Sequence, residues 1–91
     1  MLDRTHKLAT AAAKGDRANA KLQDEVFRDA LKQLEADYIE AWKGATEGVA
    51  RENLWHMVKA LENFERHLVT VVNDGKLARS EIEAMSRIKA A

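Results

Sequence analysis

Apolar residues recur along two stretches of the chain at the alternating spacing of three and four that marks one face of an α-helix. In the first stretch the repeating positions are Phe27, Leu31, Leu34, Tyr38 and Ala41. In the second stretch they are Leu54, Met57, Leu61, Phe64, Leu68 and Val71. No stretch shows the strict alternation of apolar and polar residues that is typical of a β-strand. The pattern therefore predicts an all-α protein with two long helices.

Glycine positions predict the ends of the first segments, because the chain contains no proline and only four glycines. Gly15 closes an alanine-rich N-terminal segment, residues 1–15, which we expect to be either a short helix or mobile. Asp16 is then a candidate N-cap for a helix over residues 17–43. Gly44 follows the last turn of this helix, as is common at a helix C-terminus.

The same reasoning predicts two further helices in the C-terminal half. Thr46 is the candidate cap of a helix over residues 47–73, which would stop at Gly75. Ser80, with a glutamate three residues later, has the spacing of a capping box. This motif predicts a short terminal helix over residues 80–89.

The two long helices are predicted to pack against each other as an antiparallel hairpin. If the chain folds back after Gly44, the sequence positions of two residues that face each other should add up to the same value for every pair. Five pairs sum to 95, namely Ala41–Leu54, Tyr38–Met57, Leu34–Leu61, Leu31–Phe64 and Phe27–Leu68. The length of 91 residues fits one such helical domain with short N- and C-terminal helices, and two copies could form a helical bundle.

A second apolar stripe lies beside this seam and divides into two clusters. The cluster at the open end of the hairpin contains Leu22, Val26, Val69 and Val72. The short terminal helix starts at this end and could cover it with Leu77, Ile82, Met85 and Ile88. At about 15 Å long, that helix could not reach the other end of the hairpin.

The cluster beside the hairpin turn is the candidate partner interface. Its members are Ile39, Trp42, Trp55 and Val58. Tryptophan is enriched at the energetic centres of protein interfaces, and nothing in the predicted fold obviously covers these two. A second copy or a different protein could dock here. The alternative is that the N-terminal segment, through Leu8 and its alanines, folds over them.

Composition and charge narrow the class of protein. Fifteen basic residues balance fifteen acidic ones, which argues against a general nucleic-acid binder, although residues 1–21 are basic through Arg4, Lys7, Lys14, Arg17 and Lys21. The chain contains no cysteine and no apolar run long enough to span a membrane. Its first residues lack the apolar core of a secretion signal, so we expect a cytoplasmic protein.

No arrangement of residues predicts an enzyme, a cofactor site or a metal site. The segment around Asp74 and Gly75 resembles the second half of a calcium loop, but the third ligand position would be Val72, which offers no oxygen from its side chain. His56 and His67 are eleven residues apart, too far to bind one ion. Glu52 with His56 provides two ligands without a third. The hydroxyl residues form no recognisable nucleophile with a base.

Three segments carry a resemblance to a known group of proteins. They are YIEAW from Tyr38, ARENLW from Ala50 and HLVTVVNDGKLARSE from His67. This succession is similar to small helical proteins of unknown function encoded in tailed-bacteriophage and prophage genomes. The resemblance covers about half of the chain and implies an accessory or virion-associated protein, located in the host cytoplasm or the virion. It assigns a function to no residue.

The sequence therefore predicts a protein that acts by binding and not by catalysis. Self-association through the hairpin, as a step in assembly, is the first hypothesis. A small adaptor or inhibitor of a host protein is the second, and a nucleic-acid-associated accessory protein is the third.

Overall fold

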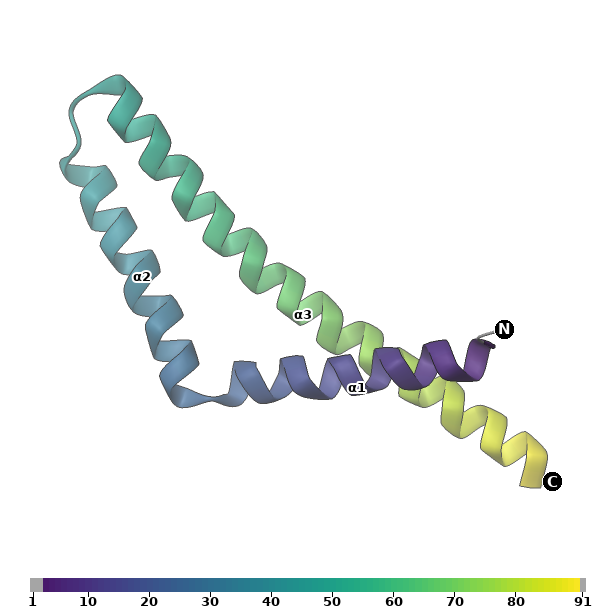
Figure 1. Cartoon of the computed structure of the whole chain (residues 1–91). Helices are drawn as coiled ribbons and strands as arrows, with labels where there is room; N and C mark the ends of the chain where they lie inside the picture. Colours follow the sequence, from purple (N-terminus) through teal and green to yellow (C-terminus); the bar gives the residue numbers. More distant parts are fainter. Residues whose placement is uncertain (1–2, 91) are drawn as a thin grey trace. The chain divides into compact units, whose positions relative to one another are not determined.

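The computed structural model describes residues 3–90 and contains three α-helices within them (Figure 1). Helix α1 spans Arg4–Gln23, α2 spans Glu25–Gly44, and α3 spans Gly48–Ala90. The chain divides into two compact units. Unit 1 combines the described parts of Met1–Lys21 and Leu68–Ala91, and unit 2 is Leu22–His67. Helix α3 therefore contributes its first half to unit 2 and its second half to unit 1.

Unit 2 is an antiparallel pair made of α2 and the first half of α3. Helix α2 starts because Asp24 adopts an extended backbone and its carboxylate accepts a hydrogen bond from the amide of Phe27, at 3.0 Å. It ends after Gly44, where Ala45 is extended and its amide donates to the carbonyl of Trp42. A connection of three residues, 45–47, leads to α3. The antiparallel hairpin expected from the heptad spacing is thus present, with a turn of the predicted length.

Unit 1 is built from α1 and the second half of α3, which cross at two glycines (Figure 1). The buried positions of α1 are Ala12, Gly15 and Ala18, and those of this part of α3 are Val72, Gly75 and Ala78. A Cβ atom built on Gly15 would lie 2.7 Å from the Cα of Gly75. Small residues at every third position therefore let the two backbones approach closely.

Charged side chains border this crossing. Arg4 pairs with Glu81 at 2.7 Å, and Arg79 pairs with Asp16. These side chains are between 47% and 70% exposed, so each pair contributes little stability and mainly favours one register of the two helices.

The predicted helix break at Gly15 is wrong, and so is the predicted stop at Gly75. Both glycines lie inside helices, and no described residue has a positive φ. Their role is the close approach of two backbones, which requires glycine for the absence of a Cβ and not for its conformational freedom. Consequently Asp16 is not an N-cap, and the cap that starts α2 is Asp24. The predicted helix over residues 17–43 is in fact divided at this aspartate.

The short terminal helices are wrong as well. The predicted helix over 47–73 and the one over 80–89 are parts of the single helix α3, so Ser80 is no cap. Thr46 is not the cap of α3 either, because the amide of Arg51 donates to the carbonyl of Glu47, the residue directly before the helix. Within residues 1–15, helix α1 already begins at Arg4, and residues 1 and 2 lie outside the described part.

The expected covering of the open-end cluster also fails. Since α3 continues straight through Gly75, its last residues do not fold back, and Leu77 and Ile88 are 68% and 76% exposed. Of the four cluster residues, Val72 is buried in unit 1, whereas Val26 is 79% exposed. The single-domain organisation stays a prediction.

Candidate protein-interaction surfaces

The predicted interface residues meet beside the turn of unit 2. The rings of Trp42 and Trp55 are in contact, with centroids 5.9 Å apart and planes tilted by 38°. Ile39 is half-buried, and Val58 is only 5% exposed. Val58 therefore packs between the two helices, so its side chain supports this surface from within and is not available to a partner. Whether a partner binds the two tryptophans stays a prediction.

Two cations lie over these indole rings. The guanidinium carbon of Arg51 is 4.1 Å from the centroid of the Trp42 ring, and the ammonium of Lys59 is 4.4 Å from that of Trp55. Both distances are within the range of cation–π attraction. The sequence analysis did not identify Arg51 or Lys59, although each is four residues from Trp55 and so lies on the same side of α3.

Arg51 is also held by the end of α2. Its Nη1 donates to the carbonyl oxygens of Trp42 at 3.4 Å and Ala45 at 3.2 Å. The last carbonyls of a helix have no partner within the helix and carry partial negative charge, so a cation there is favourable. These contacts fix the guanidinium beside the indole pair before any ligand arrives.

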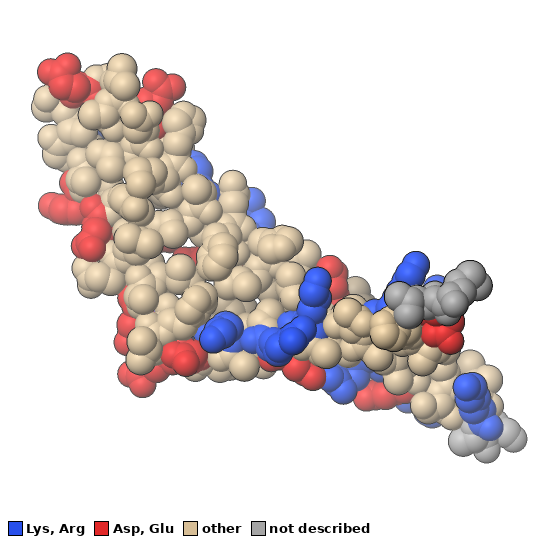
Figure 2. All heavy atoms as spheres, in the orientation of Figure 1, with Lys and Arg blue, Asp and Glu red and all other residues tan. Residues whose placement is uncertain are grey.

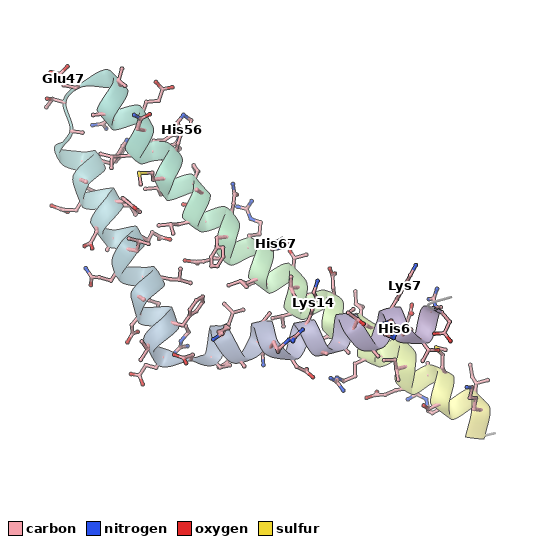
Figure 3. The ribbon with its side chains drawn as sticks, viewed as in Figure 1. His6, Lys7, Lys14, Glu47, His56 and His67 are labelled. Carbon is pink, nitrogen blue, oxygen red and sulfur yellow. The ribbon has the colours of Figure 1, made fainter. Side chains whose placement is uncertain are left out.

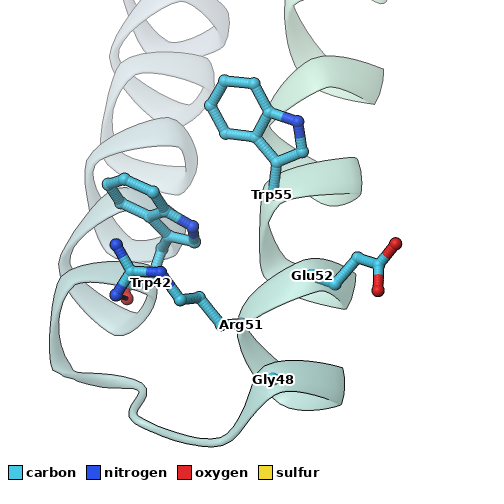
Figure 4. Close-up of a pocket in the computed structure, with 5 residues that line it drawn as sticks. All are labelled: Trp42, Gly48, Arg51, Glu52 and Trp55. Atoms are coloured by element: carbon cyan, nitrogen blue, oxygen red, sulfur yellow. Dashed lines mark hydrogen bonds between the residues drawn. The ribbon is translucent and has the colours of Figure 1, made fainter.

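A hollow of about 400 Å³ opens at this place (Figure 4). It is lined by Trp42, Gly48, Arg51, Glu52 and Trp55. The space beside Gly48 is open, because a Cβ built on this residue would meet no atom within 4 Å. Figure 4 shows the two indoles in the space between the helices and Glu52 pointing away from them. We call these five residues the tryptophan pocket.

A second hollow of about 300 Å³ lies along α2 and α3 in unit 2. It is lined by six uncharged and mainly apolar residues: Leu34, Tyr38, Met57, Ala60, Leu61 and Phe64. Leu34 is 40% exposed and Phe64 is 48% exposed. Figure 2 shows mostly uncharged surface over this unit, with acidic side chains along the outer edge of α2. We call these six residues the apolar groove.

All residues of the apolar groove except Ala60 are ones that the sequence analysis placed in the closed seam of the hairpin. The structure buries Val58 most deeply and half-buries the seam residues Tyr38 and Leu61, so the helix contact is rotated part of the way towards the second apolar stripe. Trp42 and Trp55 turn towards each other, while Met57 and Phe64 become exposed on the other side. Heptad spacing could not reveal this rotation, since both stripes have the same period.

The histidines form no metal site among the described residues. No group of three potential ligand side chains comes together within residues 3–90. His56 is 3.8 Å from Glu52, and both His56 and His67 lie on the side of α3 away from α2 (Figure 3). The calcium-like segment is an interior part of α3, and its Glu81 pairs with Arg4. In the described range, no helix is long and apolar enough to cross a membrane.

Comparison with known proteins yields no relative. No protein-family model, no curated protein and no solved structure matches this chain. The resemblance to phage-encoded helical proteins therefore stays a prediction.

Proposed function

We propose that the protein acts by binding and that its first step is self-association through the apolar groove of unit 2. The observation that carries this proposal is the groove itself: a continuous, uncharged surface made by two helices, in which Leu34, Met57 and Phe64 are each at least 40% exposed. Monomeric proteins rarely leave large apolar side chains together on their surface without a functional reason.

The thin interior of unit 2 supports a second copy as the occupant. Val58 is the one apolar residue of unit 2 in the buried class. Two helices alone form a single layer, and a helical domain normally buries its apolar stripe against another layer. An identical hairpin presents an identical groove, so a two-fold axis would satisfy both and give a four-helix bundle.

The size of the surface is compatible with such a dimer. Helix α2 has 20 residues, which corresponds to a length of about 30 Å, and two helices side by side give a width of about 20 Å. If the whole face of the hairpin around the groove were buried, each copy would contribute about 600 Å², or roughly 1,200 Å² in total, which reaches the lower limit of specific interfaces. The dimer should therefore dissociate at low concentration.

Charge gives this proposal a second measurable property. Unit 2 carries ten acidic and six Lys or Arg side chains, so two copies repel each other over distances that salt screens. The groove itself is uncharged, and its apolar contact does not depend on ion pairing. Self-association should therefore strengthen when the salt concentration rises.

The experiment is the molar mass from size-exclusion chromatography with light scattering, at two protein concentrations tenfold apart. We expect twice the chain mass at the higher concentration. Phe64→Glu should give the monomer, because it places a charge in the groove. Val49→Glu is the matched control, since Val49 is 75% exposed and lies outside the groove. A monomeric parent protein at both concentrations, or a dimer that Phe64→Glu leaves intact, would contradict the proposal.

In its biological setting, we propose an accessory or assembly protein, in line with the resemblance to phage-encoded proteins. The exposed apolar residues support the part of this proposal that concerns association.

A further inference from the structure

The tryptophan pocket and the apolar groove lie on opposite sides of α3. Trp55 and Phe64 are nine residues apart, which is about two and a half helical turns. A second copy bound in the groove would therefore leave open the wall of the tryptophan pocket that α3 provides, although Tyr38 and Trp42 are neighbours on one face of α2. The pocket is thus a separate surface that self-association does not explain.

The two indoles give this pocket an apolar and preformed wall. The two indoles are in contact with each other, and each carries a cation of the protein over its ring. Trp55 is nevertheless 42% exposed. The volume of about 400 Å³ is large enough for one or two bulky side chains. An apolar side chain of a partner could bury itself against Trp42 and Trp55 with little rearrangement, because Arg51 already fixes this end of the hairpin.

One positive charge points into the pocket. Among the described residues Arg51 forms no ion pair, and its side chain donates hydrogen bonds only from Nη1, to two carbonyl oxygens. The other guanidinium nitrogens can donate to a carboxylate, for which arginine has the matching planar geometry. Lys59 is engaged by Glu62 at 3.3 Å, and Glu52 is turned towards His56. The charge that a ligand would meet is therefore that of a single guanidinium.

The net charge of unit 2 favours a peptide carboxylate over a nucleic acid as the anion that pairs with Arg51. Unit 2 has ten acidic side chains against six basic ones. A nucleic acid presents a phosphate at every nucleotide and would be repelled, even though indoles and cations together are also found where single strands bind. A peptide with one carboxylate suffers much less repulsion and can still pair with Arg51.

We propose that the tryptophan pocket binds a segment of another protein in which a large aromatic or aliphatic side chain is next to one carboxylate. The apolar side chain packs against Trp42 and Trp55, and the carboxylate pairs with Arg51. Because the pocket is separate from the groove, both surfaces can be occupied at once. This inference does not depend on self-association.

The test is selection from a displayed library of random 12-residue peptides, with counter-selection against the Arg51→Gln protein. We expect the enriched peptides to share an Asp or Glu next to Trp, Phe or Leu. Their binding can be measured by tryptophan fluorescence, since Trp42 and Trp55 are the only two tryptophans and both line the pocket. Binding should weaken about tenfold or more in Arg51→Gln and in Trp55→Ala, as at the centre of other interfaces.

Arg51 also caps α2, so circular dichroism must show that the variants remain folded. If Arg51→Gln unfolds, Arg51→Lys keeps a cation and serves instead, with a smaller loss of affinity expected because the planar fork is absent. The proposal is overturned if no peptide is enriched, if the enriched peptides lack an acidic residue, or if folded Arg51 variants bind them unchanged. Tighter binding of an oligothymidylate than of any selected peptide would also overturn it.

The Phe64→Glu protein separates this inference from the proposed function. It should be monomeric and still bind the selected peptides with unchanged affinity. Loss of peptide binding together with loss of the dimer would mean that the two surfaces are one, and would contradict the inference.

Discussion

Units 1 and 2 share α3 and are both made of two helical segments, but the residues at their contacts have opposite sizes. In unit 1, Gly15 and Gly75 bring two backbones together, and the other buried residues are three alanines and one valine. In unit 2, Trp42 and Trp55 meet beside the turn, and large apolar side chains remain partly exposed. Unit 1 thus packs small residues at its crossing and leaves Leu77 and Ile88 exposed, whereas in unit 2 the exposed apolar side chains line a groove along α2 and α3.

The two units carry net charges of opposite sign. Unit 1 contains nine basic and five acidic side chains, and unit 2 contains six and ten. The neutral total therefore conceals two opposite local charges. Together with the exposed apolar groove, this difference supports the proposal that unit 2 binds partners, whereas unit 1 is a tightly crossed helix pair.

The largest difference between the units is expected when one methyl group is added at a glycine of each unit. In Gly75→Ala, the new Cβ would lie 2.7 Å from the Cα of Gly15, and backbone atoms cannot yield as a flexible side chain can. We expect a loss of about 1–3 kcal/mol in the free energy of unfolding. Hydrogen exchange should show lost protection in α1 while the amides of α2 keep theirs.

Gly44→Ala is the matched control, because a Cβ there meets nothing within 4 Å and the residue is helical. Alanine should stabilise by up to about 1 kcal/mol, since it loses less conformational freedom in a helix than glycine. Equal effects of the two substitutions would mean that the glycine crossing does not hold unit 1 together.

A smaller effect is expected from the buried valine of unit 2. Val58→Ala removes two methyl groups from a side chain that is 5% exposed, and should cost about 2 kcal/mol in urea unfolding. Val49→Ala removes the same atoms at a position that is 75% exposed, where changes normally stay within about 0.5 kcal/mol. Similar values for both variants would show that Val58 is not the centre of the hairpin contact.

The smallest expected effect compares two aspartates that the sequence alone does not distinguish. Asp24→Ala removes the cap of α2 and should cost about 1 kcal/mol. Asp16→Ala removes an exposed ion pair with Arg79 and should cost less than about 0.5 kcal/mol. Thermal unfolding followed by circular dichroism measures both losses of stability. A larger loss for Asp16→Ala than for Asp24→Ala would mean that Asp16 is the N-cap, as the glycine pattern predicts.

The fold was partly predictable because the relevant information is local. The three-four spacing gives the helices, and the three-residue connection at 45–47 makes the hairpin antiparallel. Asp16 and Asp24 both have the chemistry of an N-cap, and only the second is used, because the first lies where α1 continues into its crossing with α3. Sequence rules assign a helix end to a glycine such as Gly75, but close packing against another backbone is an equally good reason for glycine.

The candidate surfaces were predictable to a lesser degree. The pairing of Trp42 and Trp55 beside the turn follows from their distance to Gly44, and the sequence analysis found it. It missed Arg51, whose importance depends on contacts with the ring and carbonyls of another helix. It also assigned Phe64 to a closed seam. Two apolar stripes of equal period lie on one helix, and the sequence does not show which of them faces the neighbouring helix.

The helical class of this protein, its turn and the pair of tryptophans beside that turn could be derived from the sequence, because they depend on periodicity and on a short loop. The tertiary structure alone decided that Gly15 and Gly75 touch, that α3 continues without a break, and that the hairpin rotates to bury Val58. These outcomes depend on which residues that are distant in sequence come into contact. Such contacts decide whether a glycine or an apolar stripe is buried or exposed.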